Sequence, residues 1–395
     1  MLAILTLAAV LPNFDLATHE KPRLVKNADA ALAAEVKTVV AARNPRSAGG
    51  LHDFSSEGDY WWPDPQKPDG PYIQRDGMTN PDNFVAHRQF LLSFARNFGY
   101  LAGAYKITRE ERHARAAVKH LSAWFVEPAT RMNPSLEYSQ AIKGRFTGRG
   151  IGVIDTVHLA DVALGVEALR GAKALTPDIE KGVVGWFRDY HSWIRTHQYG
   201  IDESKAENNH GTCWVLQAAC FARLIGDQES LADCRRRLKE ILLPNQMAVD
   251  GSFPREMVRT KPYGYAVFNL DVMTAVAVVL STPQENLLTW SLPDGRSLVK
   301  GVEFLAPFVA DRNGWLKSVR KPSKPTAAQA ESSEPIKPDV MYWDDWPVRQ
   351  PFLIFGALTT GRTEWLETWK KLNPDPSVEE IIRNLPVREP VLWVR

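Results

Sequence analysis

From about residue 84 onward, the sequence repeats one pattern, in which apolar residues at helical spacing are followed by a short polar, glycine- or proline-containing connection. This spacing predicts amphipathic helices. The expected helices cover residues 84–106, 110–125, 151–169, 179–196, 212–225, 231–243, 268–280, 301–309 and 352–359. Segments of alternating polarity are scarce, so the chain is expected to be all-α.

Residues 212–225 are apolar on nearly every side, as expected of a helix that other elements cover all round. The neighbouring segments 179–196 and 231–243 are amphipathic and charged, as outer helices are. An alternation of enclosed and half-exposed helical hairpins predicts an (α/α) toroid or barrel, complete or incomplete, with long loops at its cleft. A simple helical bundle is the alternative.

The composition, with 44% hydrophobic and 24% charged residues, is typical of a globular protein with a large core. Residues 50–82 are rich in Pro, Gly, Asp and aromatic residues and predict a long ordered loop, whereas 321–339 predict a flexible loop or lid. The amino-acid composition does not change across either segment, as it would at a boundary between two domains of different type. We therefore expect a single domain over residues 21–395.

Residues 1–11 form an apolar run that is too short to span a bilayer. We expect residues 1–20 to be either a secretory signal or a packed N-terminal arm, and a signal would make the protein secreted or periplasmic. No other segment is expected to cross a membrane.

The near balance of 48 Lys and Arg residues against 46 Asp and Glu residues gives a formal charge of +2, which argues against a nucleic-acid-binding protein. The nine histidines show neither an HExxH motif nor Cys/His ligand spacing, so no metal site is expected. The cysteines Cys213, Cys220 and Cys234 are too few for a disulfide framework, and Cys213 and Cys220 are expected to be buried on one helix face.

A first polar cluster directly precedes the enclosed helix and consists of Asn208, Asn209 and His210. Backbone N–H groups at a helix N-terminus favour an anion, so these residues are candidates for the mouth of a cavity. The alternative is that one asparagine is a helix cap and His210 is an ordinary loop residue.

A second polar segment, 250–265, leads into the next apolar helix. Its candidate anion partners and phenols are Arg255, Arg259, Lys261, Tyr263 and Tyr265. The alternative is that the arginines pair with Asp250 or Glu256 and that the tyrosines fill the core.

A third segment, 135–152, contains four glycines, but no strand is expected before them and no phosphate-binding motif is present. Nucleotide binding is therefore rejected in favour of a flexible basic loop that lines a cleft for an acidic chain. The expected cleft residues are Tyr138, Gln140, Lys143, Arg145 and Arg149. Aromatic residues that stack on sugar faces, or else anchor loops, are Trp61, Trp62, Tyr72 and Trp343.

The combination of Asn209-His210 with Arg259 and Tyr265 resembles the alginate lyase superfamily of α/α-barrel polysaccharide lyases. Within it, the segments Tyr-Trp-Trp-Pro-Asp-Pro, Asp-Gly-Pro-Tyr and Arg-Asp-Gly of residues 60–77 are similar to polysaccharide lyase family 38. The resemblance spans about residues 50–360. It implies cleavage of a 1,4-linked polyuronate by β-elimination, without a metal or organic cofactor.

The same resemblance implies roles for individual residues. The asparagine–histidine pair of the superfamily maps onto Asn209 and His210, its arginine onto Arg259 and its tyrosine onto Tyr265. Tyr263 is a rival for the last role, because the arginine-to-tyrosine spacing differs from that of the related alginate lyase family 5.

The chemistry of elimination agrees with these residue types. Asn209 and Arg259 are suited to neutralise the uronate carboxylate, which makes the C5 proton more acidic. A base then removes this proton, and an acid protonates O4 of the departing sugar. A free tyrosine has a pKa of about 10 and needs a nearby cation to act as a base. In syn elimination Tyr265 is both base and acid, whereas in anti elimination His210 is the base and Tyr265 the acid.

The expected partner is an acidic polysaccharide, either alginate rich in mannuronate or a β-1,4-glucuronan. Two alternatives stay open. The first is a non-catalytic glycan-binding protein. The second is a glycoside hydrolase on a similar scaffold, which would use two of the acids Asp59, Asp64, Asp155, Glu207, Asp250, Glu256, Asp344 and Asp345.

Overall fold

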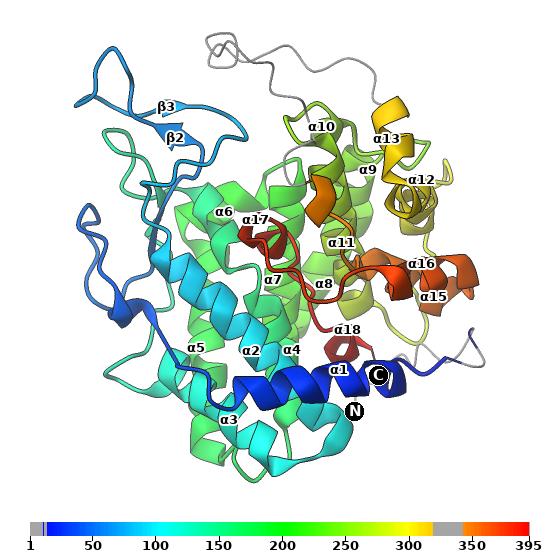
Figure 1. Cartoon of the computed structure of the whole chain (residues 1–395), viewed down its shortest axis with the longest axis horizontal. Coiled ribbons are helices and arrows are strands. Elements are labelled where there is room, and N and C mark those ends of the chain that lie inside the picture. Colours follow the sequence, from blue (N-terminus) through cyan, green and yellow to red (C-terminus); the bar gives the residue numbers. More distant parts are fainter. Residues whose placement is uncertain (1–10, 12–13, 319–342, 395) are drawn as a thin grey trace. The chain divides into compact units, whose positions relative to one another are not determined.

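The computed structural model describes residue 11 and residues 14–318 and 343–394, and these are mostly helical, which confirms the expected all-α class (Figure 1). The predicted signal lies largely outside the described residues, and the predicted lid at 321–339 lies wholly outside them. Contacts divide the chain into two compact units, called unit 1 (Met1–Phe14, Ala206–Ala219, Glu229–Arg395) and unit 2 (Asp15–Lys205, Cys220–Gln228).

Unit 2 consists of helices and two pairs of short strands. In α1, a proline and many polar residues weaken the apolar periodicity, and no helix is predicted there. α1 packs on α2, which also packs on α3 and α4 (Figure 1). The helical elements of unit 2 are α1 (Leu16–Ala31), the 3-10 turn η1 (Val39–Ala41), α2 (Ala86–Thr108), α3 (Glu111–Leu121), the π-helical turn η2 (Ser122–Val126), the 3-10 segment η3 (Gly150–Thr156), α4 (Leu159–Leu169), α5 (Pro177–Thr196), α6 (Gln198–Ser204) and the end of α7 (Asn209–Ile225).

The strands of unit 2 order the long loop that the sequence predicts at 50–82. β1 (Ser55–Glu57) pairs in parallel with β4 (Tyr138–Ala141). β2 (Trp61–Trp62) pairs antiparallel with β3 (Ile73–Gln74), so that Trp61 lies opposite Gln74. β4 corrects the expectation that no strand precedes the glycines of 144–152. The glycine motifs of nucleotide-binding loops are still missing from the sequence, so the argument against nucleotide binding stands.

An aromatic cluster forms much of the core of unit 2. The ring of Phe94 from α2 stacks on Trp124 with centroids 5.1 Å apart, and Phe125 contacts Trp186 of α5 at 4.5 Å. Each fully buried ring of this size contributes about 1.5–3 kcal/mol through the hydrophobic effect. The cluster therefore holds α2, η2 and α5 together.

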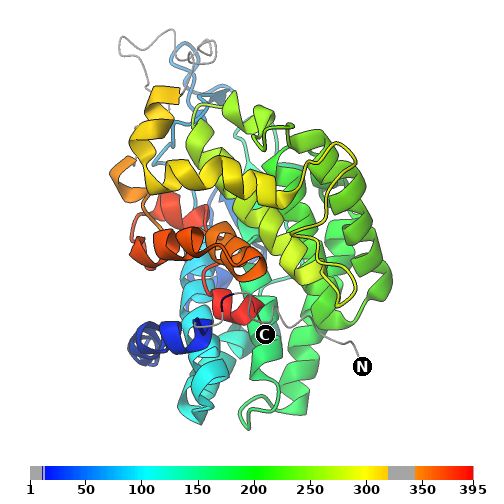
Figure 2. The ribbon, with the colours of Figure 1, turned by 90° about the vertical axis from the view of Figure 1, so that its right-hand side faces the viewer.

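Unit 1 is built around α11. α11 packs against α10, α12 and α15, and α12, α15 and α16 pack against one another (Figure 2). No helix is predicted from the sequence at α16. Besides the first part of α7, the elements of unit 1 are α8 (Gln228–Arg237), the π-helical turn η4 (Leu238–Leu242), α9 (Leu243–Gln246), α10 (Pro254–Met257), α11 (Pro262–Leu280), α12 (Leu298–Ala310), α13 (Arg312–Ser318), the 3-10 turn η5 (Trp343–Asp345), α15 (Pro351–Thr360), α16 (Thr363–Lys371), α17 (Glu379–Arg383) and α18 (Pro390–Trp393).

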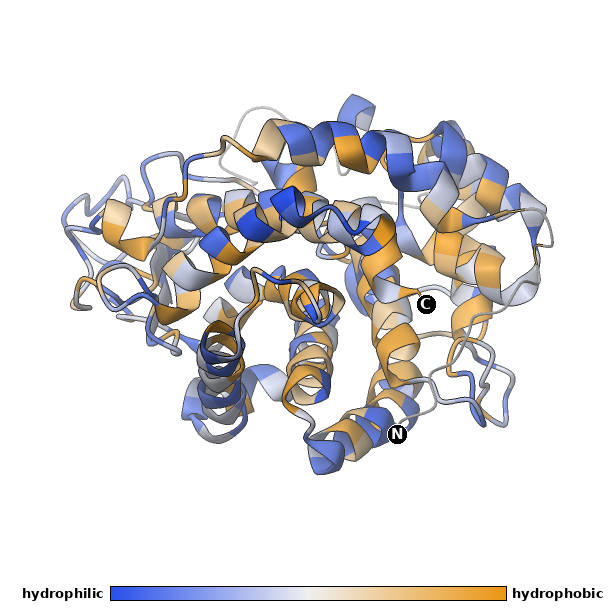
Figure 3. Ribbon diagram, turned by 90° about the horizontal axis from the view of Figure 1, so that it is seen from below, coloured by the Kyte–Doolittle hydropathy of each residue, from blue (hydrophilic) through white to orange (hydrophobic). Residues whose placement is uncertain are grey.

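α11 corrects the expectation that no segment beyond the N-terminus is apolar enough to cross a membrane. By length and composition, Pro262–Leu280 could span a bilayer, but 89% of its apolar window is buried within the protein. This burial is typical of the core helix of a globular protein. Other helices carry hydrophobic and hydrophilic residues on different faces (Figure 3), as expected of helices that are covered on one side.

α7 and α11 begin earlier than the periodicity predicts. α7 begins at Asn209 rather than at residue 212, and α11 begins at Pro262 rather than at residue 268. Proline is favoured in the first turn of a helix because its fixed φ fits and its missing N–H is not needed there. The polar residues that precede the apolar runs therefore belong to the first helical turns.

The predicted helix at 151–169 is divided into η3 and α4. A Cβ atom added at Gly152 would lie 2.0 Å from the Ser139 hydroxyl oxygen, so only glycine fits against β4 at this position. The glycines that permit this close approach also disfavour a regular helix.

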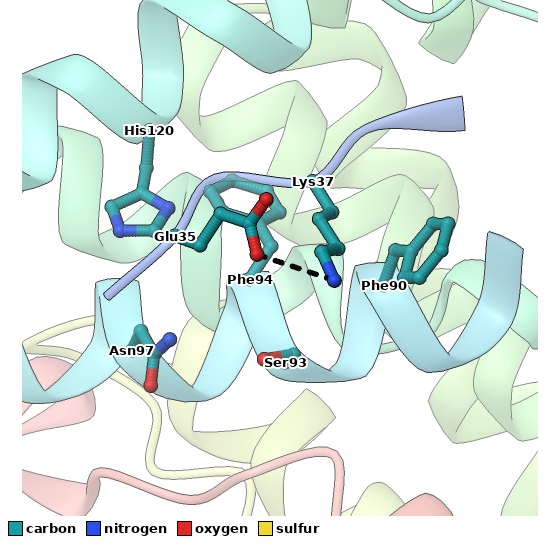
Figure 4. Close-up of a pocket in the computed structure, with 7 residues that line it drawn as sticks. All are labelled: Glu35, Lys37, Phe90, Ser93, Phe94, Asn97 and His120. Carbon is teal, nitrogen blue, oxygen red and sulfur yellow. Dashed lines mark ion pairs between the residues drawn. The ribbon is translucent and has the colours of Figure 1, made fainter. Parts of the chain in front are cut away.

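A small pocket lies in unit 2 between α2, α3 and the segment after α1 (Figure 4). Glu35 and Lys37 form an ion pair of 3.2 Å at this pocket. His120 of α3 also lines it, together with Phe90, Ser93, Phe94 and Asn97 of α2. Its volume of about 50 Å³ has room for about one or two water molecules, so it is too small for a sugar residue.

Burial makes two histidines of unit 2 sensitive to acid. Burial, assisted by Lys119, lowers the pKa of His120 to about 4, and burial lowers the pKa of His191 to about 4. Between the ordinary pKa of about 6.5 and this value, the unfolded chain binds protons that the folded chain does not. The free energy of unfolding therefore falls as the pH falls through this range, by about 2 kcal/mol per histidine at pH 5.

We expect urea unfolding to show this loss between pH 7 and pH 5. His120→Gln should lower the stability at pH 7, because the site is buried, but should show a smaller further loss on acidification. An equal loss in the variant and the wild-type protein would contradict this assignment.

Candidate active site

Asn209 and His210 form the first turn of α7 in unit 1. Asn209 is buried, with its backbone N–H donating to Glu256 Oε1 at 2.7 Å and its Nδ2 donating to Glu256 Oε2 at 2.8 Å. His210 is half-buried, and its backbone N–H donates to Asn208 Oδ1 at 3.3 Å. The Glu256 carboxyl thus caps α7 from another element, at the end of the helix where a negative charge is favoured.

Gln246 of α9 connects the beginning of α7 with α11. This residue is 3% exposed, and its Oε1 accepts hydrogen bonds from Thr212 Oγ1 at 3.1 Å and from Asn269 Nδ2 at 2.9 Å. Its Nε2 donates to the carbonyl of Asn208 at 3.1 Å. Because a buried amide that is hydrogen-bonded through both its oxygen and its nitrogen holds a defined orientation, Gln246 links the first turn of α7 to the second turn of α11.

Arg259 and Tyr265 lie together beside Glu256. The Arg259 guanidinium carbon is 4.2 Å from the centroid of the Tyr265 ring, and both residues are half-buried. The Arg259 backbone N–H donates to the carbonyl of Glu256 at 3.1 Å. Burial raises the pKa of Glu256, whereas its hydrogen bonds with Asn209 and the charges of Arg259 and His210 act in the opposite direction. Asn209 is thus bonded to the Glu256 carboxyl, and the charges of Arg259 and His210 act on it. Tyr265 joins this cluster through its contact with Arg259.

Tyr263 is fully buried, which favours Tyr265 over it as the catalytic tyrosine. Its ring packs edge-on against Trp315, Trp343 and Trp346, with centroids 5.4, 5.2 and 5.8 Å away. The packing matches the alternative in which a tyrosine fills the core. Trp343, a predicted sugar platform, is half-buried and has this contact with Tyr263, which favours the role of a loop anchor.

Lys261 and Arg255, both predicted anion partners, have carboxylate partners within the protein. Lys261 Nζ lies 2.8 Å from Glu380 of α17 in a pair whose side chains are 11% and 9% exposed. Arg255 is exposed and lies 2.7 Å from Glu207. The buried pair favours a structural role for Lys261 over the predicted contact with substrate, whereas the side chain of Arg255 is exposed.

In unit 2, aromatic and basic side chains form what we call the platform, which comprises Trp61, Trp62, Tyr72, Arg75, Lys143, Arg145 and Arg149. Arg145 and Arg149 lie 5.3 and 5.8 Å from the ring of Trp61. Lys143 lies 5.7 Å from the ring of Tyr72. Lys143 and Arg145 are exposed, and the aromatic rings are half-buried.

The platform rests on ordered backbone, which corrects the expectation of a flexible loop at 135–152. Gln140 is buried in β4, and its Nε2 donates to Asp155 at 2.9 Å. Arg149 Nε donates to the carbonyl of Gln140 at 2.9 Å. Gln140 therefore supports the site from within rather than lining a cleft. Tyr138 is half-buried at the start of the same strand.

Several acids considered for glycoside hydrolysis are engaged in other contacts. Asp59 accepts two hydrogen bonds from Arg88, at 2.8 and 2.6 Å, and Asp155 is bonded to Gln140 and Ser56. Asp344 and Asp345 are exposed, and Asp64 is half-buried. In residues 14–318 and 343–394, no three His, Cys, Asp or Glu side chains gather in a way that could hold a metal ion. The cysteines in this part of the chain are free and buried, as expected.

Sequence reasoning missed the partners that hold these residues. The sequence indicates Glu256 only as a hydrolytic acid or an arginine partner, and it does not indicate a role for Gln246 or Glu380. Glu256 is 47 positions from Asn209, and Glu380 is 119 positions from Lys261. No local spacing connects residues so far apart.

The two possible roles of Lys261 are separable by mutation. We expect Lys261→Met to lower the free energy of unfolding by about 2 kcal/mol, because Glu380 loses the more buried of its two cationic partners and keeps only Arg383. The double variant Lys261→Met/Glu380→Leu should recover much of this loss. Lys370→Met, which breaks an exposed pair with Glu367, is the control and should cost less than about 1 kcal/mol. Unchanged stability with a higher KM for an acidic polysaccharide would instead make Lys261 a substrate contact.

Comparison with known proteins agrees with the fold and indicates the family. The sequence profile of the family described as alginate lyase matches residues 38–315. Comparison with curated protein sequences gives no significant match.

Among solved structures, the chain is similar to an alginate lyase from Bacteroides ovatus, with 27% identity, a TM-score of 0.77 and coverage of 95% of this chain and 93% of that one. Alginate lyase A1-III from Sphingomonas species A1 has 14% identity, a TM-score of 0.54 and coverage of 96% and 94%, and shows likeness of fold alone. The predicted (α/α) toroid is the fold of these structures. Because the profile covers most of its length, the chain belongs to the alginate lyase family.

Proposed function

We propose that the protein is a polysaccharide lyase that cleaves alginate by β-elimination through Asn209, His210, Arg259 and Tyr265. The observation that carries this proposal is that Asn209, Arg259 and His210 all interact with the Glu256 carboxyl. The Arg259 guanidinium in turn lies 4.2 Å from the centre of the Tyr265 ring. Membership of the alginate lyase family supports it. A histidine-to-alanine variant of the Sphingomonas enzyme, similar in fold with 13% identity, is described in complex with a tetrasaccharide.

The first task of such an enzyme is to neutralise the uronate carboxylate. Arg259 supplies a positive charge, and Asn209 supplies an amide N–H in the first turn of α7. Hydrogen bonds from charged and preorganised donors stabilise the enolate-like charge that develops when C5 loses its proton. A helix N-terminus adds a further favourable field for an anion.

The second task is proton transfer. A base takes the proton from C5, the electrons of that bond form the C4–C5 double bond, the C4–O4 bond breaks, and an acid gives O4 a proton. A cation next to a phenol stabilises its ionised form, and Arg259 occupies such a position beside Tyr265. Tyr265 then serves as base and acid in syn elimination, or His210 serves as the base and Tyr265 as the acid in anti elimination.

We propose that the platform of unit 2 binds further uronate residues of the polymer. Its aromatic rings offer faces for sugar rings, and the exposed Lys143 and Arg145 offer charge for carboxylates. Mannuronate-rich alginate is one candidate substrate. The likeness of residues 60–77 to polysaccharide lyase family 38 makes a β-1,4-glucuronan a second candidate. A polymeric substrate, together with the apolar segment at residues 1–11, also favours a secreted or periplasmic location.

Incubation with polymannuronate, polyguluronate and glucuronan tests the reaction. We expect ultraviolet absorbance from the unsaturated product with at least one of them. Tyr265→Phe should lower kcat by about 10²–10⁴-fold, because it removes the proton-transfer group. Tyr263→Phe is the matched control and should keep most of the activity, because that ring is buried in the core.

No absorbance with any polyuronate would overturn the proposal. New reducing ends without absorbance would indicate a glycoside hydrolase, and binding without any product would indicate a glycan-binding protein. Loss of activity in Tyr263→Phe, with Tyr265→Phe active, would exchange the roles of the two tyrosines.

The platform has its own test. We expect Lys143→Gln/Arg145→Gln to raise KM for a long polyuronate about two- to tenfold with little change in kcat, because exposed charges contribute modestly to binding. The difference from the wild-type protein should shrink at high salt. Arg115→Gln/Lys119→Gln, an equal loss of two positive charges at exposed positions of α3, should leave KM unchanged. A KM unaffected by the double variant would remove the platform from the substrate-binding surface.

A further inference from the structure

The two carboxyl oxygens of Glu256 both accept hydrogen bonds from one residue, Asn209, which a simple structural ion pair would not require. The Glu256 side chain is almost fully buried, with 1% of the residue exposed. One carboxyl oxygen accepts the backbone N–H of Asn209, and the other accepts the side-chain Nδ2 of the same residue. Both the position of Asn209 and the rotation of its amide are therefore set by one group.

These two hydrogen bonds determine which atoms of the Asn209 amide can still bind a ligand. A carboxylate only accepts hydrogen bonds, so the amide nitrogen must face Glu256, and the amide oxygen must face away from it. The nitrogen carries two hydrogens, of which one is donated to Glu256. The second hydrogen is thereby held in a fixed direction, and a preorganised donor stabilises developing charge without having to reorient during the reaction.

We propose that Glu256 is a positioning residue that aims the free amide N–H of Asn209 at the uronate carboxylate. This inference rests on the proposed lyase function and deepens it. Arg259 follows Glu256 in the same turn and donates its backbone N–H to the Glu256 carbonyl, so the same short segment sets the second group proposed to neutralise the carboxylate. Glu256 itself contacts Asn209 and takes no part in proton transfer.

The substitution Glu256→Gln is a sharp probe because it preserves the size of the side chain. A glutamine has one acceptor oxygen, so it satisfies only one of the two N–H groups of Asn209 and turns its own N–H₂ toward the other. The Asn209 amide is then free to rotate. Glu389→Gln, at another buried acid of unit 1, is the matched control for a loss of negative charge, and it should leave kcat unchanged.

A double-mutant cycle with Asn209→Ala separates positioning from structural support. In the wild-type background we expect Glu256→Gln to lower kcat on the best polyuronate by about 10–100-fold, with a smaller effect on KM. In the Asn209→Ala background, the same change should lower kcat less than about threefold, because the group on which it acts is gone. Equal losses in both backgrounds would overturn the proposal.

Two further measurements keep the test decisive. If Glu256→Gln does not fold, Glu256→Asp, which keeps both oxygens, replaces it in the same cycle. Calorimetric binding of a mannuronate tetrasaccharide in the Tyr265→Phe background should show a coupling in Kd of the same sign as in kcat but smaller. Coupled binding in a protein without lyase activity would refute the proposed reaction but keep the positioning role. If the wild-type protein is an active lyase but the two substitutions change Kd independently of each other, the proposed reaction would stand and the positioning role would be refuted.

Discussion

The two hydrogen bonds between Asn209 and the buried carboxyl of Glu256 are the contacts on which the candidate site depends. They fix where α7 begins, because the carboxyl satisfies the N–H of its first residue. They also bring the turn that carries Arg259 to the start of α7. Gln246 reinforces this arrangement by bonding to Asn208, Thr212 and Asn269. The site is thus assembled from the first turns of two helices, held by buried polar groups whose geometry leaves little freedom.

Most of the fold could be predicted from the sequence, because amphipathic helices leave a periodic pattern that does not depend on distant residues. The helices α2, α5 and α12 follow that pattern closely. The beginnings of α7 and α11 could not be predicted, because Asn209 and Pro262 enter the helix through a cap from Glu256 and a fixed proline φ rather than through apolar spacing. α1 was missed because Pro22 and its polar residues obscure the pattern.

The site was predictable in part. The order of Asn209, His210, Arg259 and Tyr265 indicated the family, and the structure brings these residues together. The packing of Tyr263 among tryptophans and the pairing of Lys261 with Glu380 could not be foreseen. Both depend on segments far away along the chain, and residue type alone does not distinguish a buried tyrosine or lysine from one that faces a substrate.

A crystal structure of the Tyr265→Phe variant with a mannuronate tetrasaccharide would test the central claim most directly. We expect one uronate carboxylate to lie within hydrogen-bonding distance of both Asn209 Nδ2 and the Arg259 guanidinium, with Glu256 still bonded to Asn209. C5 of that sugar should face the position of the missing Tyr265 hydroxyl. A tetrasaccharide whose carboxylates contact neither Asn209 nor Arg259 would contradict the account.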